Sequence, residues 1–204
     1  MSNILIILAH PNPNSLNHAI ARTAENTLIE LGHRVIFHDL YAEGFDPNLL
    51  ATEIPNGASL DPTMQLHCDE LANANGLVIV HPNWWGAPPA IMKGWIDRVF
   101  RPDVAYRFIG EDGGEGVPEG LLKAEKALVF HTANTAEKRE AEVFGDPLDL
   151  MWRKCVFGLC GVKDVRRRTF SIVITSTAME RKRWLDEVAE MVGNAFPYTE
   201  TQAV

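Results

Sequence analysis

Near its start the chain carries the apolar run Ile4-Leu5-Ile6-Ile7-Leu8-Ala9, which stops abruptly at His10-Pro11-Asn12-Pro13. A continuous apolar run that ends in turn residues is typical of a central strand in a parallel sheet, because such a strand is covered on both faces. The stretch therefore predicts that the chain starts with a buried strand whose carboxyl end opens into a polar loop.

The chain beyond this strand alternates between helical and strand patterns. Apolar residues at steps of three and four predict a helix over 16–31 that ends at Gly32, and a short strand follows at 35–37. Further strands are predicted at 77–80, 127–130 and 170–174, and further helices at 63–75, 90–99, 146–159 and 184–192. This alternation indicates an α/β fold, a three-layer doubly wound sheet of five parallel strands.

The length of 204 residues favours one domain with a substantial core. We expect this domain to cover residues 1–197 and the tail at 198–204 to be frayed. The segments 41–62 and 101–120 are rich in polar, proline and glycine residues, which predicts two irregular excursions.

The net charge of −8 argues against a nucleic-acid or anionic-membrane partner, because such surfaces need a basic face. The short basic run 166–168 is interpreted as the solvated start of the last strand. Three cysteines without a Cys-x-x-Cys spacing predict neither disulfides nor a zinc site, and we expect all three to be reduced and mostly packed. Without a recognisable signal peptide or membrane-spanning apolar run, a cytoplasmic location is predicted.

In a doubly wound sheet, ligands bind beyond the carboxyl ends of the strands, which points to the loops 10–17, 81–89 and 131–135. The first loop precedes a helix whose free N–H groups and partial positive charge suit a phosphate, with Ser15 and Asn17 as added donors. The alternative is that Asn14 or Ser15 serves only as a helix N-cap. The loop lacks the glycine patterns of Rossmann and nucleoside-triphosphate sites.

The second loop, His81-Pro82-Asn83-Trp84-Trp85-Gly86-Ala87-Pro88-Pro89, contains two adjacent tryptophans. Both cannot bury easily, so at least one is expected to present a flat face, on which a planar heterocycle such as isoalloxazine stacks well. The alternative is that both indoles only plug the end of the sheet.

The residues from 82 to 100 follow the pattern Pro-x-x-Trp-x-x-x-Pro-Ala-x-x-Lys-Gly-Trp-x-Asp-Arg-Val-Phe. This pattern, together with Ala9-His10-x-x-x-x-Ser15-x-Asn17, resembles the NAD(P)H:quinone oxidoreductase family, which includes DT-diaphorase, modulator-of-drug-activity proteins and ancillary subunits of potassium efflux systems. The resemblance implies a flavodoxin-like fold and a flavin-dependent oxidoreductase that passes hydride from NADH or NADPH to a quinone or similar small acceptor. It also implies a homodimer, and FMN is slightly favoured over FAD.

The resemblance carries roles to individual positions of this chain. The implied flavin-binding residues are His10, Asn12, Ser15, Leu16, Asn17, Pro82, Asn83, Trp84, Trp85, Gly86, His131, Thr132, Ala133 and Asn134. His131 and Trp85 are the candidate catalytic residues, with His131 either donating a hydrogen bond, taking up a proton on flavin reduction, or serving only a structural role. Tyr106, Phe108 and Phe144 are expected in the substrate pocket, with Tyr106 reaching across the dimer interface. Lys93 and Arg98 are interpreted as structural.

Several positions depart from the family pattern. Trp84 stands where a glutamine is common, Gly86 stands where an aromatic residue is common, and His131-Thr132-Ala133-Asn134 replaces a common Thr-Thr-Gly-Gly. The tyrosine and histidine of the quinone reductases have no counterpart, because Lys138 or Arg139 and Phe144 occupy the nearest positions. Two other functions therefore stay open: a regulatory flavoprotein that docks on a transporter or another partner, and a one-electron carrier like flavodoxin.

Overall fold

A parallel sheet of five strands organises the molecule, as the computed structural model shows for residues 1–109, 116 and 118–198. Its strands are β1 (Asn3–Leu8), β2 (Arg34–Asp39), β3 (Gly76–Pro82), β6 (Lys126–Ala133) and β7 (Asp164–Ser171), in the order β2-β1-β3-β6-β7. This order is that of the flavodoxin-like doubly wound sheet, so the predicted fold class is confirmed.

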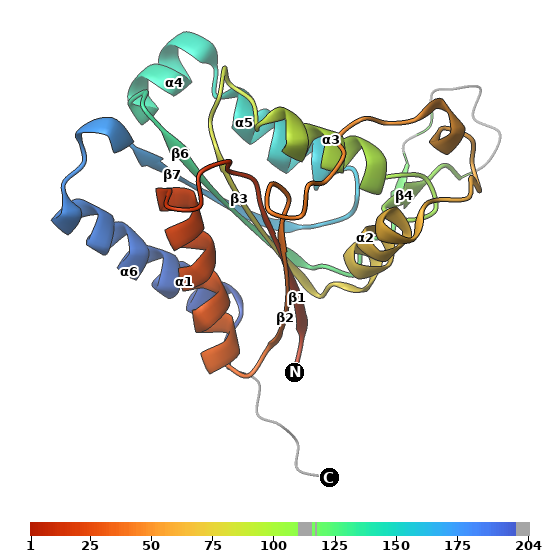
Figure 1. The fold of residues 1–204 in the computed structure, drawn as a ribbon, viewed down its shortest axis with the longest axis horizontal. Coiled ribbons are helices and arrows are strands. Elements are labelled where there is room, and N and C mark those ends of the chain that lie inside the picture. The colour runs from red at the N-terminus through yellow and green to blue at the C-terminus, as the bar shows by residue number, and fades with distance from the viewer. Residues whose placement is uncertain (110–115, 117, 199–204) are drawn as a thin grey trace.

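Helices cover both faces of this sheet, giving the three predicted layers (Figure 1). The helices α1 (Leu16–Glu30) and α6 (Ala178–Ala195) lie on one face, where their apolar residues pack against Ile4, Ile6 and Leu8 of β1. The other face carries α2 (Pro62–Asn73), α3 (Ala90–Val99), α5 (Pro147–Asp149) and the π-helical segment η2 (Leu150–Val156), packed against Leu5 and Ile7. The alternation along β1 explains why its sequence is apolar without interruption.

The smaller elements lie in the connections. The first excursion contains the 3₁₀ turn η1 (Ala51–Glu53), and the second contains the antiparallel pair β4 (Tyr106–Arg107) and β5 (Glu119–Gly120). The helix α4 (Glu137–Phe144) follows β6, and the 3₁₀ turn η3 (Val173–Thr175) precedes α6. Residues 110–115 and 117 of the second excursion, and 199–204 of the predicted frayed tail, lie outside the described residues.

The last strand and its basic run differ from the prediction. The strand β7 begins at Asp164 rather than at residue 170, so the arginines 166–168 lie within it and are not its solvated start. Arg167 is largely buried and pairs with Asp146 and Asp149, and Arg168 pairs with Glu137 and Glu187. These carboxylates, which are distant in sequence, let a charged segment form a sheet edge.

Two further expectations were wrong. Between the predicted strand at 127–130 and the predicted helix at 146–159 the sequence predicts only a loop, yet residues 137–144 form α4, a helix without a buried residue. Cys155 was expected to be packed but is exposed, whereas Cys68 and Cys160 are buried.

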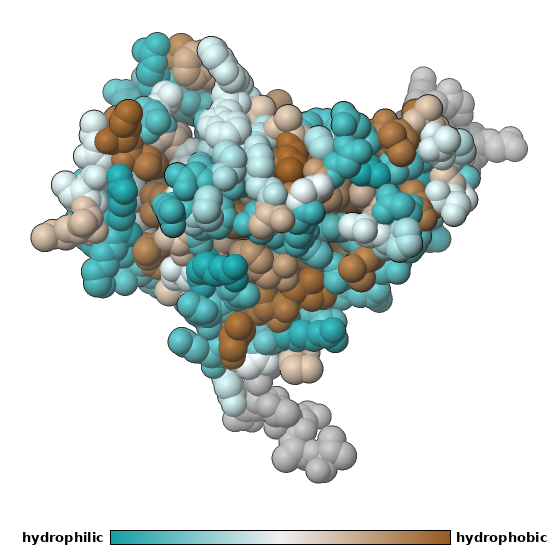
Figure 2. Space-filling model, in the orientation of Figure 1, coloured by the Kyte–Doolittle hydropathy of each residue, from teal (hydrophilic) through white to brown (hydrophobic). Residues whose placement is uncertain are grey.

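Among the described residues, no helix combines the length and apolar character that a bilayer crossing requires. On the face seen in Figure 2, hydrophilic residues predominate and apolar residues occur in small groups between them.

Candidate functional site

Two adjoining cavities open at the carboxyl edge of the sheet. The first cavity has a volume of about 410 Å³ and the second a volume of about 420 Å³. They lie where the loops after β1, β3 and β6 meet, which is where the strand order reverses between β1 and β3. Asn83, Ala133, Asn134 and Thr135 line both cavities, so ligands that occupied the two would lie against each other.

Different elements supply the rest of each wall. The first cavity is also lined by His10, Asn14, Ser15, Leu16, Asn17, Pro82, Trp84, Thr132, Val173 and Arg181. The second cavity is also lined by Trp85, Gly86, Glu140, Phe144 and Pro147. The first cavity is thus bounded by a helix N-terminus and polar groups, and the second mainly by aromatic and other apolar side chains.

The loop after β1 is ordered by its own polar side chains. Ser15 is the N-cap of α1, and its Oγ accepts a hydrogen bond from the backbone N–H of His18 at 3.3 Å. Asn12 accepts from the backbone N–H of Asn14 through its Oδ1 and from that of Ser15 through its carbonyl oxygen. Asn12 therefore shapes the loop without lining the cavity, while the first N–H groups of α1 are directed towards the cavity end of the helix.

Asn17 carries the clearest sign of an external partner. Its side chain is buried, and its Nδ2 donates to Thr132 Oγ1 at 2.9 Å. Its Oδ1 is buried and has no hydrogen-bond partner among the described residues. A buried polar atom without a partner costs about 1–3 kcal/mol, so this oxygen on a cavity-lining residue fits a ligand that supplies a donor.

The loop after β3 makes a tight turn that exposes one indole. Trp84 and Ala87 exchange two backbone hydrogen bonds, and the central residues Trp85 and Gly86 both have a positive φ, 58° and 72°. A non-glycine residue in this region is strained, which often accompanies function. The Trp85 side chain is fully exposed at 103%, whereas Trp84 is exposed at 41% and lies 6.2 Å from the His10 ring, centroid to centroid.

Asn83 ties this turn to the rest of the site. Its backbone N–H donates to the Thr132 carbonyl oxygen at 2.7 Å, and its Oδ1 accepts from the backbone N–H of Gly86 at 3.0 Å. Its Nδ2 donates to Glu140 Oε1 at 3.0 Å, which brings a carboxylate from α4 to the second cavity. Gly86 also leaves room for Pro147, because a Cβ on residue 86 would lie only 2.8 Å from the proline ring.

The loop after β6 lines both cavities and is bonded to the segment before α6. Ala133 and Asn134 line both cavities, and Asn134 Oδ1 accepts a hydrogen bond from the backbone N–H of Ile174 at 2.9 Å. That bond links the loop to the segment before α6. Thr132 faces the first cavity from the end of β6.

His131 occupies a different environment from the one expected. It lies within β6, is buried, and contacts Thr169 Oγ1 at 2.8 Å and Arg167 Nη1 at 3.2 Å through its Nε2. Its ring stacks on His81, with the two centroids 5.7 Å apart. Burial, with the neighbouring His81 and Arg167, lowers the pKa of His131 to about 2, and burial lowers the pKa of His81 to about 4. Both rings are neutral at pH 7, and neither lines a cavity.

The predicted substrate residues are separated in the structure. Phe144 lines the second cavity, whereas Tyr106 and Phe108 belong to the second excursion and line neither cavity. Thr135 lies in the predicted loop 131–135, whereas sequence reasoning did not identify Glu140, Pro147, Val173 or Arg181 as cavity residues. The helix α4 was not expected, and this is why Glu140 was missed. Arg181 lies one turn into α6 after the Thr177–Glu180 capping box, a pattern visible in the sequence.

The helical half of the motif is structural, as expected for Lys93 and Arg98. Lys93 pairs with Asp97 at 2.5 Å on the surface. Arg98 is buried and donates to both oxygens of Glu53, from Nε at 2.9 Å and from Nη2 at 2.5 Å. This hydrogen bonding holds the pKa of the buried Glu53 carboxyl below its ordinary value. Gly94 allows the first excursion to approach, since a Cβ there would lie 2.2 Å from the Pro47 carbonyl oxygen.

Comparisons with known proteins agree with this architecture. Residues 2–191 match a protein family described by a flavodoxin-like fold. A protein of Haemophilus influenzae, named an uncharacterized NAD(P)H oxidoreductase, is 33% identical over 195 residues, covering 92% of this chain and 93% of that protein. The solved structure of Smu.1420 from Streptococcus mutans has a TM-score of 0.80 at 30% identity, covering 94% of this chain and 99% of that chain. The NAD(P)H:quinone oxidoreductase from Methanothermobacter marburgensis has a TM-score of 0.77 at 25% identity, covering 95% and 96%.

Proposed function

The chain belongs to the protein family with the flavodoxin-like fold, and on that premise we propose that it is a flavin-dependent NAD(P)H oxidoreductase that reduces a quinone or a similar small acceptor. The names of its Haemophilus relative and of the Methanothermobacter enzyme support the activity. The observation that carries the proposal is the pair of adjoining cavities, one polar and one apolar, at the switch point of the sheet.

The residues of the first cavity fit a flavin mononucleotide. The N-terminus of α1, with Ser15 and Asn14 beside it, suits one phosphate group. The buried Asn17 Oδ1 suits a donor on the ligand, and Pro82 and Trp84 supply flat apolar surface. We favour FMN over FAD, because the N-terminus of α1, with Asn14 and Ser15 beside it, suits a single terminal phosphate. Asn12 shapes the loop behind these contacts.

When bound, flavin supplies the redox chemistry, accepting hydride from a nicotinamide and passing reducing equivalents to the acceptor. The chain supplies binding, orientation and exclusion of water. The second cavity, with Trp85 and Phe144 on its walls, suits the planar nicotinamide and then the acceptor in turn. Asn83, Ala133 and Asn134, which line both cavities, place that second site against the first.

His131 has a positioning role in this proposal. Its side chain joins β6 to β7 through Thr169 and Arg167, and its low pKa makes it unsuited to exchange a proton near neutral pH. We therefore propose that His131 stays neutral and holds β6 against β7. Among the candidate catalytic residues, Trp85 is retained as a surface for the substrate.

We also propose that the active form is a homodimer. A fully exposed tryptophan beside a cavity is unusual in a monomer and is typical of an interface. Phe108 and Phe144 are also more than half exposed. A second copy could close the cavity with its Tyr106–Phe108 segment. Light scattering coupled to gel filtration should give twice the monomer mass, and a monomer that retains full turnover would contradict this arrangement. The predicted cytoplasmic location stays a prediction.

The visible spectrum of the purified protein, followed by anaerobic addition of NADH or NADPH, tests the proposed activity. We expect a yellow protein, or one that turns yellow on addition of FMN, whose flavin bands bleach with a reduced nicotinamide and return when a quinone is added. A protein that takes up neither FMN nor FAD would refute the proposal. Bleaching by only one of the two nucleotides would identify the coenzyme.

A further inference from the structure

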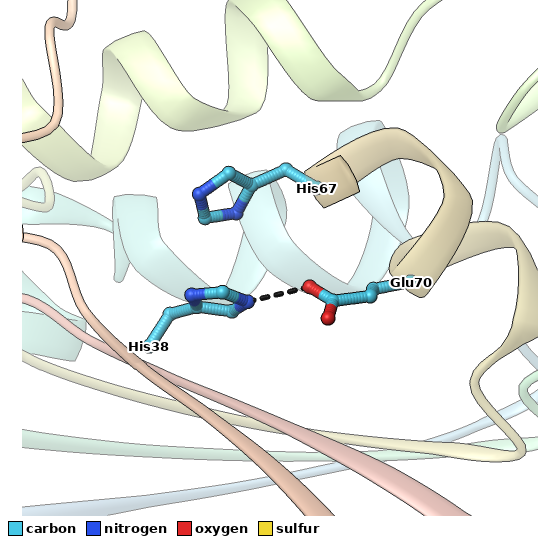
Figure 3. A group of neighbouring side chains, drawn as sticks. All are labelled: His38, His67 and Glu70. Atoms are coloured by element: carbon cyan, nitrogen blue, oxygen red, sulfur yellow. Dashed lines mark hydrogen bonds and ion pairs between the residues drawn. The ribbon is translucent and has the colours of Figure 1, made fainter. Parts of the chain in front are cut away.

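A group of metal-ligating side chains lies away from both cavities, between β2 and α2. This group, the histidine cluster, consists of His38, His67 and Glu70 (Figure 3). His38 lies near the end of β2, and His67 and Glu70 are three residues apart on one face of α2. None of the three lines the first or the second cavity.

One ligand atom from each of these residues lies within 4.8 Å of those of the other two. His38 Nε2 and Glu70 Oε2 are 2.6 Å apart, and the two imidazole rings have centroids 4.1 Å apart and planes inclined by 40°. Figure 3 shows the Glu70 carboxylate and the two rings directed towards one another. From this geometry we propose that the histidine cluster binds one divalent transition-metal ion of the zinc class through two imidazole nitrogens and one carboxylate.

A fourth side chain, Glu43, supports this proposal because it contacts the ring nitrogen of His38 that lies away from Glu70. Glu43 contacts His38 Nδ1 with both oxygens, at 3.0 and 3.1 Å, and its Oε2 lies 3.9 Å from His67 Nε2. Histidines that ligate metals usually direct the other ring nitrogen at a carboxylate, which fixes the ring and strengthens it as a ligand. With His38 ligating through Nε2, Glu43 takes this position for the His38 ring, whereas its distance from His67 is too long for a hydrogen bond.

The ion has two hydrogen bonds to displace. A proton now joins His38 Nε2 to Glu70, and the metal takes the place of that proton, so the two atoms separate to roughly 3.3 Å, as tetrahedral zinc with ligands at about 2.0–2.2 Å requires. The buried Trp95 Nε1 donates to His67 Nδ1 at 3.3 Å and must release it. That contact is long for a hydrogen bond, so the Trp95 N–H competes only weakly with the metal for His67 Nδ1.

The histidine cluster adjoins a cavity with several carboxylates, through which a cation can reach His67. A cavity of about 250 Å³ is lined by Glu43 and His67, and Asp46, Asp61 and Arg98 also face it. Three protein ligands leave one position of a tetrahedral ion open, which is the arrangement of sites that bind a water or a small molecule.

The test is titration of the metal-free, flavin-loaded protein with Zn²⁺ by calorimetry at pH 7.5, with Co²⁺ absorption as an optical check. We expect one ion per chain, and intense visible bands from Co²⁺ in a tetrahedral site. Glu70→Gln should weaken Zn²⁺ binding about 100-fold. The matched control is Asp69→Asn, which removes the same charge from α2 at an exposed neighbour that contacts only α2 residues; its affinity should stay within twofold of wild type.

Trp95→Phe sharpens the test because it removes the competing N–H donor, and it should tighten Zn²⁺ binding about threefold or more. Circular dichroism of each variant verifies that it is folded. Equal affinities of the Glu70→Gln and Asp69→Asn variants, or no stoichiometric binding by the folded wild type, would overturn the proposal and leave the cluster as a hydrogen-bonded pair of histidines. Neither readout depends on flavin reduction, so this proposal and the proposed oxidoreductase activity fail separately.

Discussion

The first cavity and the histidine cluster are both polar sites, but they differ in whether their polar atoms already have hydrogen-bond partners within the chain. In the first cavity, Asn17 Oδ1 is buried without a partner among the described residues, and the N-terminus of α1 is directed at the cavity. In the histidine cluster, each nitrogen of His38 already has a carboxylate. The first kind of site needs a ligand that brings its own donors, whereas the second can bind an ion only by releasing a proton.

The largest loss of stability is expected from removing the buried Arg98–Glu53 ion pair, whose Arg98 lines the same cavity as His67 of the histidine cluster. Arg98→Met leaves the buried Glu53 carboxylate without its partner, which should cost about 3–5 kcal/mol in the free energy of unfolding. Urea unfolding followed by far-UV circular dichroism measures this loss. The surface variant Lys93→Met, on the same helix, should change the free energy by less than 1 kcal/mol. Similar losses of free energy in the two variants would show that the Arg98–Glu53 pair does not stabilise the packing of the first excursion against α3.

A change at Ser15 acts on the first cavity alone. Ser15→Asp keeps a good N-cap for α1 but places a carboxylate where we propose the flavin phosphate, so the Kd for FMN should rise about 100-fold, or about 2.7 kcal/mol. Fluorescence titration with FMN measures it. Ser15→Thr, which keeps a hydroxyl, should bind FMN nearly as well as wild type. Zn²⁺ affinity should be unchanged in both variants, and unchanged FMN affinity in Ser15→Asp would place the phosphate elsewhere.

Acid should destabilise the fold through the two buried histidines behind the cavities. The unfolded chain takes up protons at His81 and His131 below about pH 6.5, but the folded chain does not until about pH 4 and about pH 2, respectively. Their contribution is therefore present above pH 6.5 and is lost as the pH falls, by about 1.4 kcal/mol per pH unit for each histidine. Urea midpoints between pH 7.5 and 5 measure the slope, and His131→Asn should reduce it by about half of the histidine contribution. An unchanged slope in that variant would show that His131 has the same pKa in the folded and the unfolded chain.

The smallest expected effect on stability is at Trp85. Because its indole is fully exposed, Trp85→Ala should change the free energy of unfolding by no more than about 0.5 kcal/mol. The KM for an aromatic acceptor should nevertheless rise about fivefold, as expected for the loss of about 1 kcal/mol of stacking. Trp85→Phe should retain most of the wild-type KM. Steady-state kinetics decide this, and an unchanged KM in Trp85→Ala would remove Trp85 from the substrate site.

The fold could be predicted from the sequence because its strands are local, uninterrupted apolar runs. The apolar runs 4–9 and 77–80 predicted the positions of β1 and β3. The turn residues that follow each run predicted the loops that line both cavities. The helix α4 could not be found in this way, because it is short, mostly polar and charged, and buries no residue. The strand β7 was placed late because its arginines find their carboxylate partners only in the folded chain.

The candidate site could be predicted less completely. The loops were identified, but the direction of His131 was not, although alternation along a strand contains the information: Thr132 faces the first cavity, so its neighbour must face away. No metal site was predicted from the sequence, because the prediction considered only the number and spacing of the cysteines. The histidine cluster joins β2 to α2, and nothing in the local pattern around His38 indicates that His67 and Glu70 lie beside it.

The tight turn that exposes Trp85 gives the molecule a built-in optical probe. Trp95 and Trp152 are fully buried and Trp184 is partly buried against the core, whereas Trp84 and Trp85 line the cavities and meet solvent. Emission at the long-wavelength edge of the intrinsic fluorescence should therefore come mainly from these two indoles. A planar ligand in either cavity should quench that edge first, while the short-wavelength emission of the buried indoles reports on the core, so one spectrum separates occupancy of the site from unfolding of the chain.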